Sequence, residues 1–147
     1  MTPLSIRVAA AEATFAAYEG KRFVWGRHDC VRLAAHALRG LGYKPRLSRG
    51  GAYASALGAA KALKRTGFVS IEAALDDLGL ARVSWSYAMA GDIVALPGTD
   101  CMRALGVVLG PGHVLAFSPH DDLCRVAAPP AEDVQILWSA PPCLKPR

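Results

Sequence analysis

The chain has 147 residues, enough for one domain with its own hydrophobic core. Hydrophobic residues make up 52% of it and charged residues 20%, a balance that excludes a disordered or fibrous protein. No run reaches the roughly 18 apolar residues of a membrane span, and the first residues lack the basic and apolar order of a signal peptide. We therefore expect a protein made in a cytosol.

The net charge is +5, but the basic residues are scattered over several predicted elements without aromatic residues between them. This pattern favours solvated faces over a nucleic-acid surface. The four cysteines, at positions 30, 101, 124 and 143, form no CxxC pair and have no zinc-site spacing. We expect no metal cluster, with a mixed Cys/His site formed only in three dimensions as the alternative, no cofactor and, in a reducing compartment, no disulfide.

The first half of the chain predicts helices, because Ala-rich and Leu-rich runs end at glycines. The predicted helices cover residues 5–19, 30–41, 52–65 and 71–78. After Gly79, short apolar and β-branched runs alternate with Gly and Pro, which is typical of strands joined by turns. The predicted strands cover residues 92–96, 105–109, 113–117, 123–126 and 134–138.

Helices followed by a run of strands predict an α+β domain, in which N-terminal helices pack on a small C-terminal antiparallel sheet. We expect one domain over residues 1–147, with an irregular tail from about residue 140.

Cys30 is predicted to lie at the first turn of the second helix, because Asp29 is a good N-cap residue. The helix dipole and the neighbouring Arg27 and His28 are a setting that lowers a thiol pKa, as a nucleophile requires. The alternative is a small core residue, since free cysteines are among the most buried side chains.

Three segments together resemble the NlpC-type cysteine peptidases, papain-like enzymes that cleave peptidoglycan stem peptides. The segments are FVWGRHDC at 23–30, AGDIVAL at 90–96 and LGVVLG at 105–110, and the likeness extends from about residue 23 to 117. The FxWGxxDC opening is closest to a short branch found among bacteriophage tail genes. The resemblance implies a papain-like fold, Cys30 as nucleophile, and a place in the tail-tip or baseplate hub of a virion.

The catalytic histidine of these peptidases corresponds to Ala104, which cannot accept a proton. His113 becomes the base only if the strand register shifts, with His120 or a carboxylate orienting it; otherwise His113 is an ordinary strand residue. His28 either holds a cationic ring near the thiol or lies in a solvated loop.

Other residues of the opening motif also have two interpretations. Trp25, with Phe23, either walls a substrate cleft or anchors the loop in the core. Asp29 either contacts a substrate or only caps the helix. Asp92 is predicted to bond turn amides.

Three functions follow from the resemblance. The first is a tail-tip structural protein, with weakened or lost catalysis, that docks on neighbouring hub proteins. The second is an active endopeptidase that opens peptidoglycan during DNA entry, with Cys30 attacking a peptide carbonyl. The third is a binding module that holds peptidoglycan peptides without cleaving them.

Overall fold

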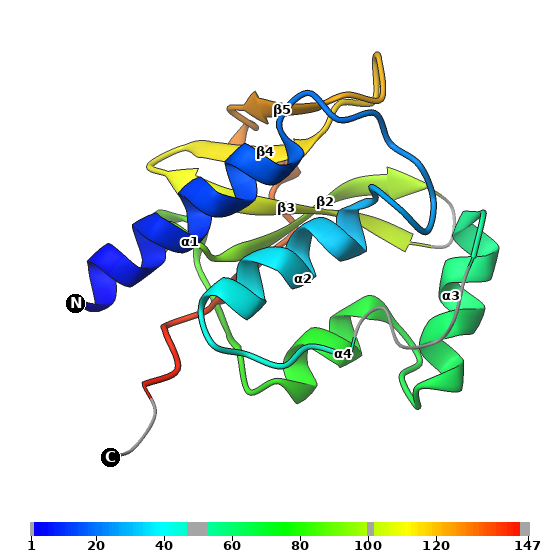
Figure 1. Cartoon of the computed structure of the whole chain (residues 1–147), viewed down its shortest axis with the longest axis horizontal. Coiled ribbons are helices and arrows are strands. Elements are labelled where there is room, and N and C mark those ends of the chain that lie inside the picture. Colours follow the sequence, from blue (N-terminus) through cyan, green and yellow to red (C-terminus); the bar gives the residue numbers. More distant parts are fainter. Residues whose placement is uncertain (1, 47–52, 100–101, 145–147) are drawn as a thin grey trace.

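The fold was determined as a computed structural model, which describes residues 2–46, 53–99 and 102–144. These residues form four α-helices and a six-stranded antiparallel sheet (Figure 1). The predicted α+β class is confirmed, with the long helices first and most of the sheet after them. None of the described helices combines the length and the apolar character that crossing a bilayer requires.

Each α-helix begins after a residue whose side chain accepts from a backbone amide of the first turn. The capping residues are Thr2, Asp29, Ser55 and Ser70. The helices are α1 (Pro3–Tyr18), α2 (Cys30–Gly40), α3 (Ala56–Arg65) and α4 (Ile71–Asp77). The first helix was predicted from residue 5 and the third from residue 52. They begin instead at Pro3 and Ala56, because Thr2 and Ser55 are their N-cap residues.

The sheet has the strand order β1-β6-β2-β3-β4-β5. Its strands are β1 (Ala81–Val83), β2 (Ile93–Thr99), β3 (Met102–Gly110), β4 (His113–Phe117), β5 (Cys124–Ala127) and β6 (Ile136–Ser139). Five of them match predicted strands within a few residues at each end. The sixth, β1, was not predicted, because three mostly exposed residues are too short a run to establish an alternating apolar pattern. Two 3-10 helices, η1 (Trp85–Tyr87) and η2 (Ala131–Asp133), lie in the connections.

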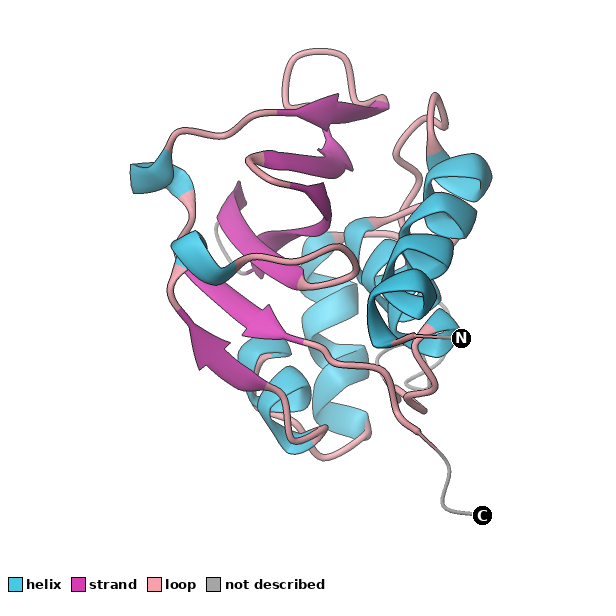
Figure 2. Ribbon diagram, turned by 90° about the vertical axis from the view of Figure 1, so that its left-hand side faces the viewer, coloured by secondary structure: helices cyan, strands magenta, loops and turns pink. Residues whose placement is uncertain are grey.

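Both faces of the central strands are buried. On one face, Val107 and Leu115 belong to the main core, which also contains most of the buried residues of α2. On the other face, Val108 and Val114 belong to a smaller core that Trp85 helps to cover. Figure 2 shows the long helices on one side of the sheet and the two 3-10 helices on the other. The helix that carries Cys30 thus packs against β3 of the sheet and against α1.

A buried carboxylate ties α1, the start of β2 and the end of β6 together. Asp92 is fully buried and accepts from Arg7 Nη1 at 2.6 Å, from the Met89 amide at 2.9 Å and from the Ala140 amide at 2.8 Å. The predicted role of Asp92 in bonding turn amides is confirmed. The ion pair with Arg7, 85 residues away in the chain, was not predicted.

The segment after Ala140 forms no helix or strand in residues 141–144, as predicted, and residues 145–147 lie outside the described part of the chain. The Cys143 amide donates to the Leu41 carbonyl at 2.8 Å, which holds this segment against the end of α2.

Candidate active site

Cys30 is the first residue of α2, as the sequence predicts. The Asp29 carboxylate caps the helix, since its Oδ1 accepts from the Arg32 amide at 2.9 Å. The helix lies against β3, and the thiol hydrogen-bonds the backbone of Leu105 in that strand. The fold therefore places a cysteine at a helix N-terminus directly over the centre of an antiparallel sheet.

The environment of this thiol is not the one that the sequence predicts. Cys30 is 6% exposed and belongs to the main core. Burial raises the pKa of the Cys30 thiol to about 11, and the nearby Asp29 carboxylate raises it further, while the Leu105 backbone opposes both effects. The expectation of a lowered thiol pKa was wrong, because desolvation outweighs the helix dipole.

The two basic residues expected to assist the thiol face elsewhere. Arg27 is exposed, and the ring of His28 packs edge-on against Tyr18 with 6.0 Å between ring centroids. On its other side Tyr18 packs against His36 at 5.7 Å, and His36 Nδ1 bonds the Thr14 hydroxyl at 2.8 Å. His28 is therefore a half-buried packing residue of an aromatic group formed with α1.

The sheet register separates His113 from Cys30. Ala104 precedes Leu105 in β3 and pairs with Leu96, which packs against the smaller core on the other face of the sheet, whereas His113 is the first residue of β4 and pairs with Gly110. Leu105 and Gly110 are five positions apart along β3, about 17 Å at the usual rise of a strand. A register irregularity between Val108 and Gly110 does occur, but it leaves the histidine at this far end.

The His113 ring is occupied locally. Its Nδ1 contacts the Pro111 carbonyl at 3.0 Å, and the residue is exposed. His120, the predicted orienting residue, is exposed in the turn between β4 and β5. The structure therefore assigns His113 the alternative interpretation, an exposed strand residue, and does not bring a histidine to the place that Ala104 occupies.

Asp29 has more partners than a helix cap needs. Its side chain is completely buried, and Oδ2 accepts from the Gly26 amide at 2.8 Å, from the Tyr53 hydroxyl at 2.9 Å and from Arg32 Nη1 at 3.3 Å. Arg32 also donates to the Tyr53 hydroxyl at 2.6 Å. Burial, followed by the Asp29 carboxylate, raises the pKa of Tyr53, so the phenol stays a donor.

Arg32 and Tyr53 are the site residues that sequence reasoning missed. Tyr53 lies 24 residues after Asp29, and no periodic pattern links the two positions. The contact is also tight at the backbone. Gly26 has φ +80, and a Cβ there would lie 2.4 Å from the Tyr53 carbonyl oxygen, so the loop requires glycine.

Aromatic rings fix the same loop from the side. Phe23 meets Trp25 at 4.7 Å and Phe117 at 5.1 Å between ring centroids, and Trp25 meets Tyr53 at 6.3 Å. Trp25 is half-buried and packs against the main core. These contacts match the interpretation of Trp25 as the residue that anchors the loop.

Residues 5–140 match a protein family described as a domain of unknown function (DUF6950). The chain belongs to this family. A search of curated proteins finds no match. The matched span includes all the site residues above, and also Arg7 and Ala140, which bond the buried Asp92 carboxylate from α1 and from the end of β6. The DUF6950 domain therefore corresponds to the fold as a whole.

Cys124 is buried and Cys143 exposed, both as free thiols, whereas Cys101 lies outside the described residues. Across residues 2–46, 53–99 and 102–144, no three His, Cys, Asp or Glu side chains gather as a metal ion would require.

Proposed function

We propose that this chain is a structural protein of a bacteriophage tail tip or baseplate hub, with an NlpC-peptidase-like fold that has lost peptidase catalysis. The observation that carries the loss of catalysis is the thiol of Cys30, buried in the core with a pKa of about 11. The tail location rests on the resemblance of the FVWGRHDC segment to proteins of that assembly.

The thiol lacks both requirements of a cysteine nucleophile. A thiol with a pKa of about 11 is ionised in only about one molecule in ten thousand at pH 7. A neighbouring base is the usual remedy, but Ala104 stands next to the strand position that the thiol contacts, and His113 lies at the far end of β3. Cys30 then acts as a small core residue at the start of α2.

The Asp29 network fits a structural role for the same reason. Asp29, Arg32 and Tyr53 satisfy one another, and the described residues contain no buried side-chain polar atom without a partner. A substrate-binding group that waits for a ligand commonly has unused donors or acceptors directed into a cleft. Here these polar groups fasten the loop at 23–29 to the segment that follows residue 52.

The test is made in particles of the phage that encodes the chain. Mass spectrometry of purified particles should find the chain, and Cys30→Ala should leave particle yield and infectivity within about twofold of the parent, since the change removes only a small core group. His113→Ala serves as a matched control at an exposed position. Intact Cys30→Ala particles that fail to infect would contradict the proposal.

One observation favours a second candidate, an active peptidoglycan endopeptidase. Cys30 begins a helix and contacts a strand of an antiparallel sheet, which is the placement that the resemblance requires of a nucleophile. Incubation of the purified chain with isolated peptidoglycan separates the candidates. We expect no release of stem peptides and no difference between the parent and Cys30→Ala. Release that depends on Cys30 would establish the peptidase.

A further inference from the structure

The outer side of α1 carries apolar side chains where a surface helix normally carries polar ones. Leu4, Val8 and Phe15 are 57%, 39% and 38% exposed. At about 100° per residue, positions 4, 8, 11 and 15 fall on one stripe of the helix. The stripe borders the packed side of α1, where Thr14 and Tyr18 are buried, and Ala11 at this border is itself buried.

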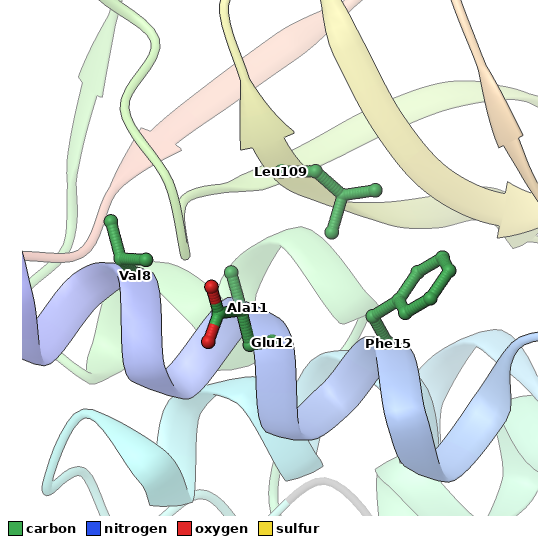
Figure 3. Close-up of a pocket in the computed structure, with 5 residues that line it drawn as sticks. All are labelled: Val8, Ala11, Glu12, Phe15 and Leu109. Carbon is green, nitrogen blue, oxygen red and sulfur yellow. The ribbon is translucent and has the colours of Figure 1, made fainter.

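The stripe forms one wall of a groove whose opposite wall comes from the sheet. Val8, Ala11 and Phe15 face Leu109, near the end of β3, across a volume of about 230 Å³ (Figure 3). Glu12 also lines the groove and is the only charged residue among its lining residues in the described part of the chain. The groove is therefore apolar on both sides, with a single carboxylate at its edge.

The charge of this groove is opposite to that of the chain. The chain carries a net charge of +5. The two charged residues of α1 are Glu12 and Arg7, and Arg7 forms a buried ion pair with Asp92. Glu12 is exposed, and no described residue forms an ion pair with it. An apolar surface with one unpaired carboxylate is complementary to an apolar surface with one cation.

We propose that this α1 groove, formed by Val8, Ala11, Glu12, Phe15 and Leu109, binds an amphipathic helix of a different protein, with apolar residues on one face and a Lys or Arg that pairs with Glu12. A helix fits because its side chains form a ridge that an apolar groove accommodates. A second copy of this chain fits less well, because a twofold contact on the stripe places two Glu12 carboxylates in one apolar interface without a cation.

The identity of the partner rests on the proposed function, which makes it a neighbouring protein of the tail tip or hub. The test distinguishes failure of the groove proposal from failure of the tail-tip function. A photo-crosslinking benzoylphenylalanine is incorporated at Phe15 in cells that produce the particles, and the adducts are read in the cells before particles are purified. Absence of the chain from purified particles would overturn the tail-tip function and leave the adduct to decide the groove.

We expect an adduct with another protein, and we expect its crosslinked peptide to carry apolar residues and a Lys or Arg at helical spacing. Glu12→Lys should reduce the adduct by at least about tenfold, because it places like charges together. Glu132→Lys, the same charge change at an exposed position in η2, should leave the adduct unchanged. No adduct, an adduct with a second copy of this chain, or an adduct insensitive to Glu12→Lys would each overturn the proposal.

Discussion

Replacement of Arg7 by methionine should destabilise the fold more than any surface change. Arg7 and Asp92 lie 2.6 Å apart with side chains 5% and 1% exposed, so Arg7→Met leaves an unpaired carboxylate in the core. Removal of one partner of a buried ion pair costs about 3–5 kcal/mol. Two backbone amides still bond Asp92, which places the expected loss near the lower end, at about 3 kcal/mol.

The assay is urea unfolding at pH 7, followed by tryptophan fluorescence. The matched control is Arg125→Met, because the Arg125–Asp121 pair has side chains 54% and 39% exposed, and an ion pair open to solvent contributes little to stability. The free energy of unfolding of a small domain is only about 5–15 kcal/mol, so a loss of about 3 kcal/mol in Arg7→Met is a large fraction of it and is easily measured. Equal losses for both variants would refute the role of Asp92 as the buried link between α1 and the sheet.

Three further predictions concern the site and the aromatic group beside it. Gly26→Ala should lower the free energy of unfolding in urea by more than about 2 kcal/mol. Gly20→Ala, at a similar φ but with open space around it, should lower it by about 1 kcal/mol, and equal losses would contradict the close approach of Gly26 to Tyr53. Tyr53→Phe should lose about 1–2 kcal/mol by leaving Asp29 without its phenol donor, and a neutral result would show that the hydroxyl does not support the loop. Burial lowers the pKa of His36 below its ordinary value of 6.5, so its stabilisation is complete above pH 6.5 and is lost as the pH falls toward the folded value. The free energy of unfolding should therefore fall more steeply between pH 7 and 5 in the parent than in His36→Gln, and parallel curves would contradict this.

The parts of the fold that short-range patterns determine could be predicted. Asp29 and Ser70 cap the helices that follow them, and a run of helix-forming residues comes directly after each cap. The strand at His113–Phe117 was predicted with its observed bounds, because a glycine-containing turn precedes it and its apolar residues form a continuous buried run.

The long-range contacts could not be predicted from local patterns. Asp92 and Arg7 lie 85 residues apart, and an arginine in an otherwise apolar helix gives no sign that it is buried in an ion pair. Tyr53 reaches Asp29 only because the segment after residue 52 crosses the loop at Gly26. Such contacts depend on the tertiary arrangement, which local propensity does not specify.

The thiol shows the same limit in its electrostatics. The sequence correctly placed Cys30 at the start of a helix but predicted a lowered pKa from the helix dipole, Arg27 and His28. The fold turns His28 toward Tyr18 and buries the sulfur, and the loss of solvation is the larger effect. The residues next to Cys30 in the sequence therefore predict its place at the helix start, but they do not predict its burial or its pKa.

The alkylation rate of Cys30 as a function of pH, read by peptide mass spectrometry, tests the loss of catalysis most directly. Exposed Cys143 provides an internal control, because the reagent reaches its thiol in the folded protein. We predict that Cys30 reacts far more slowly than Cys143 and that its apparent pKa lies well above the free value of about 8.5. Rapid alkylation of Cys30 near pH 7, with an apparent pKa below that value, would contradict the account and indicate an active nucleophile.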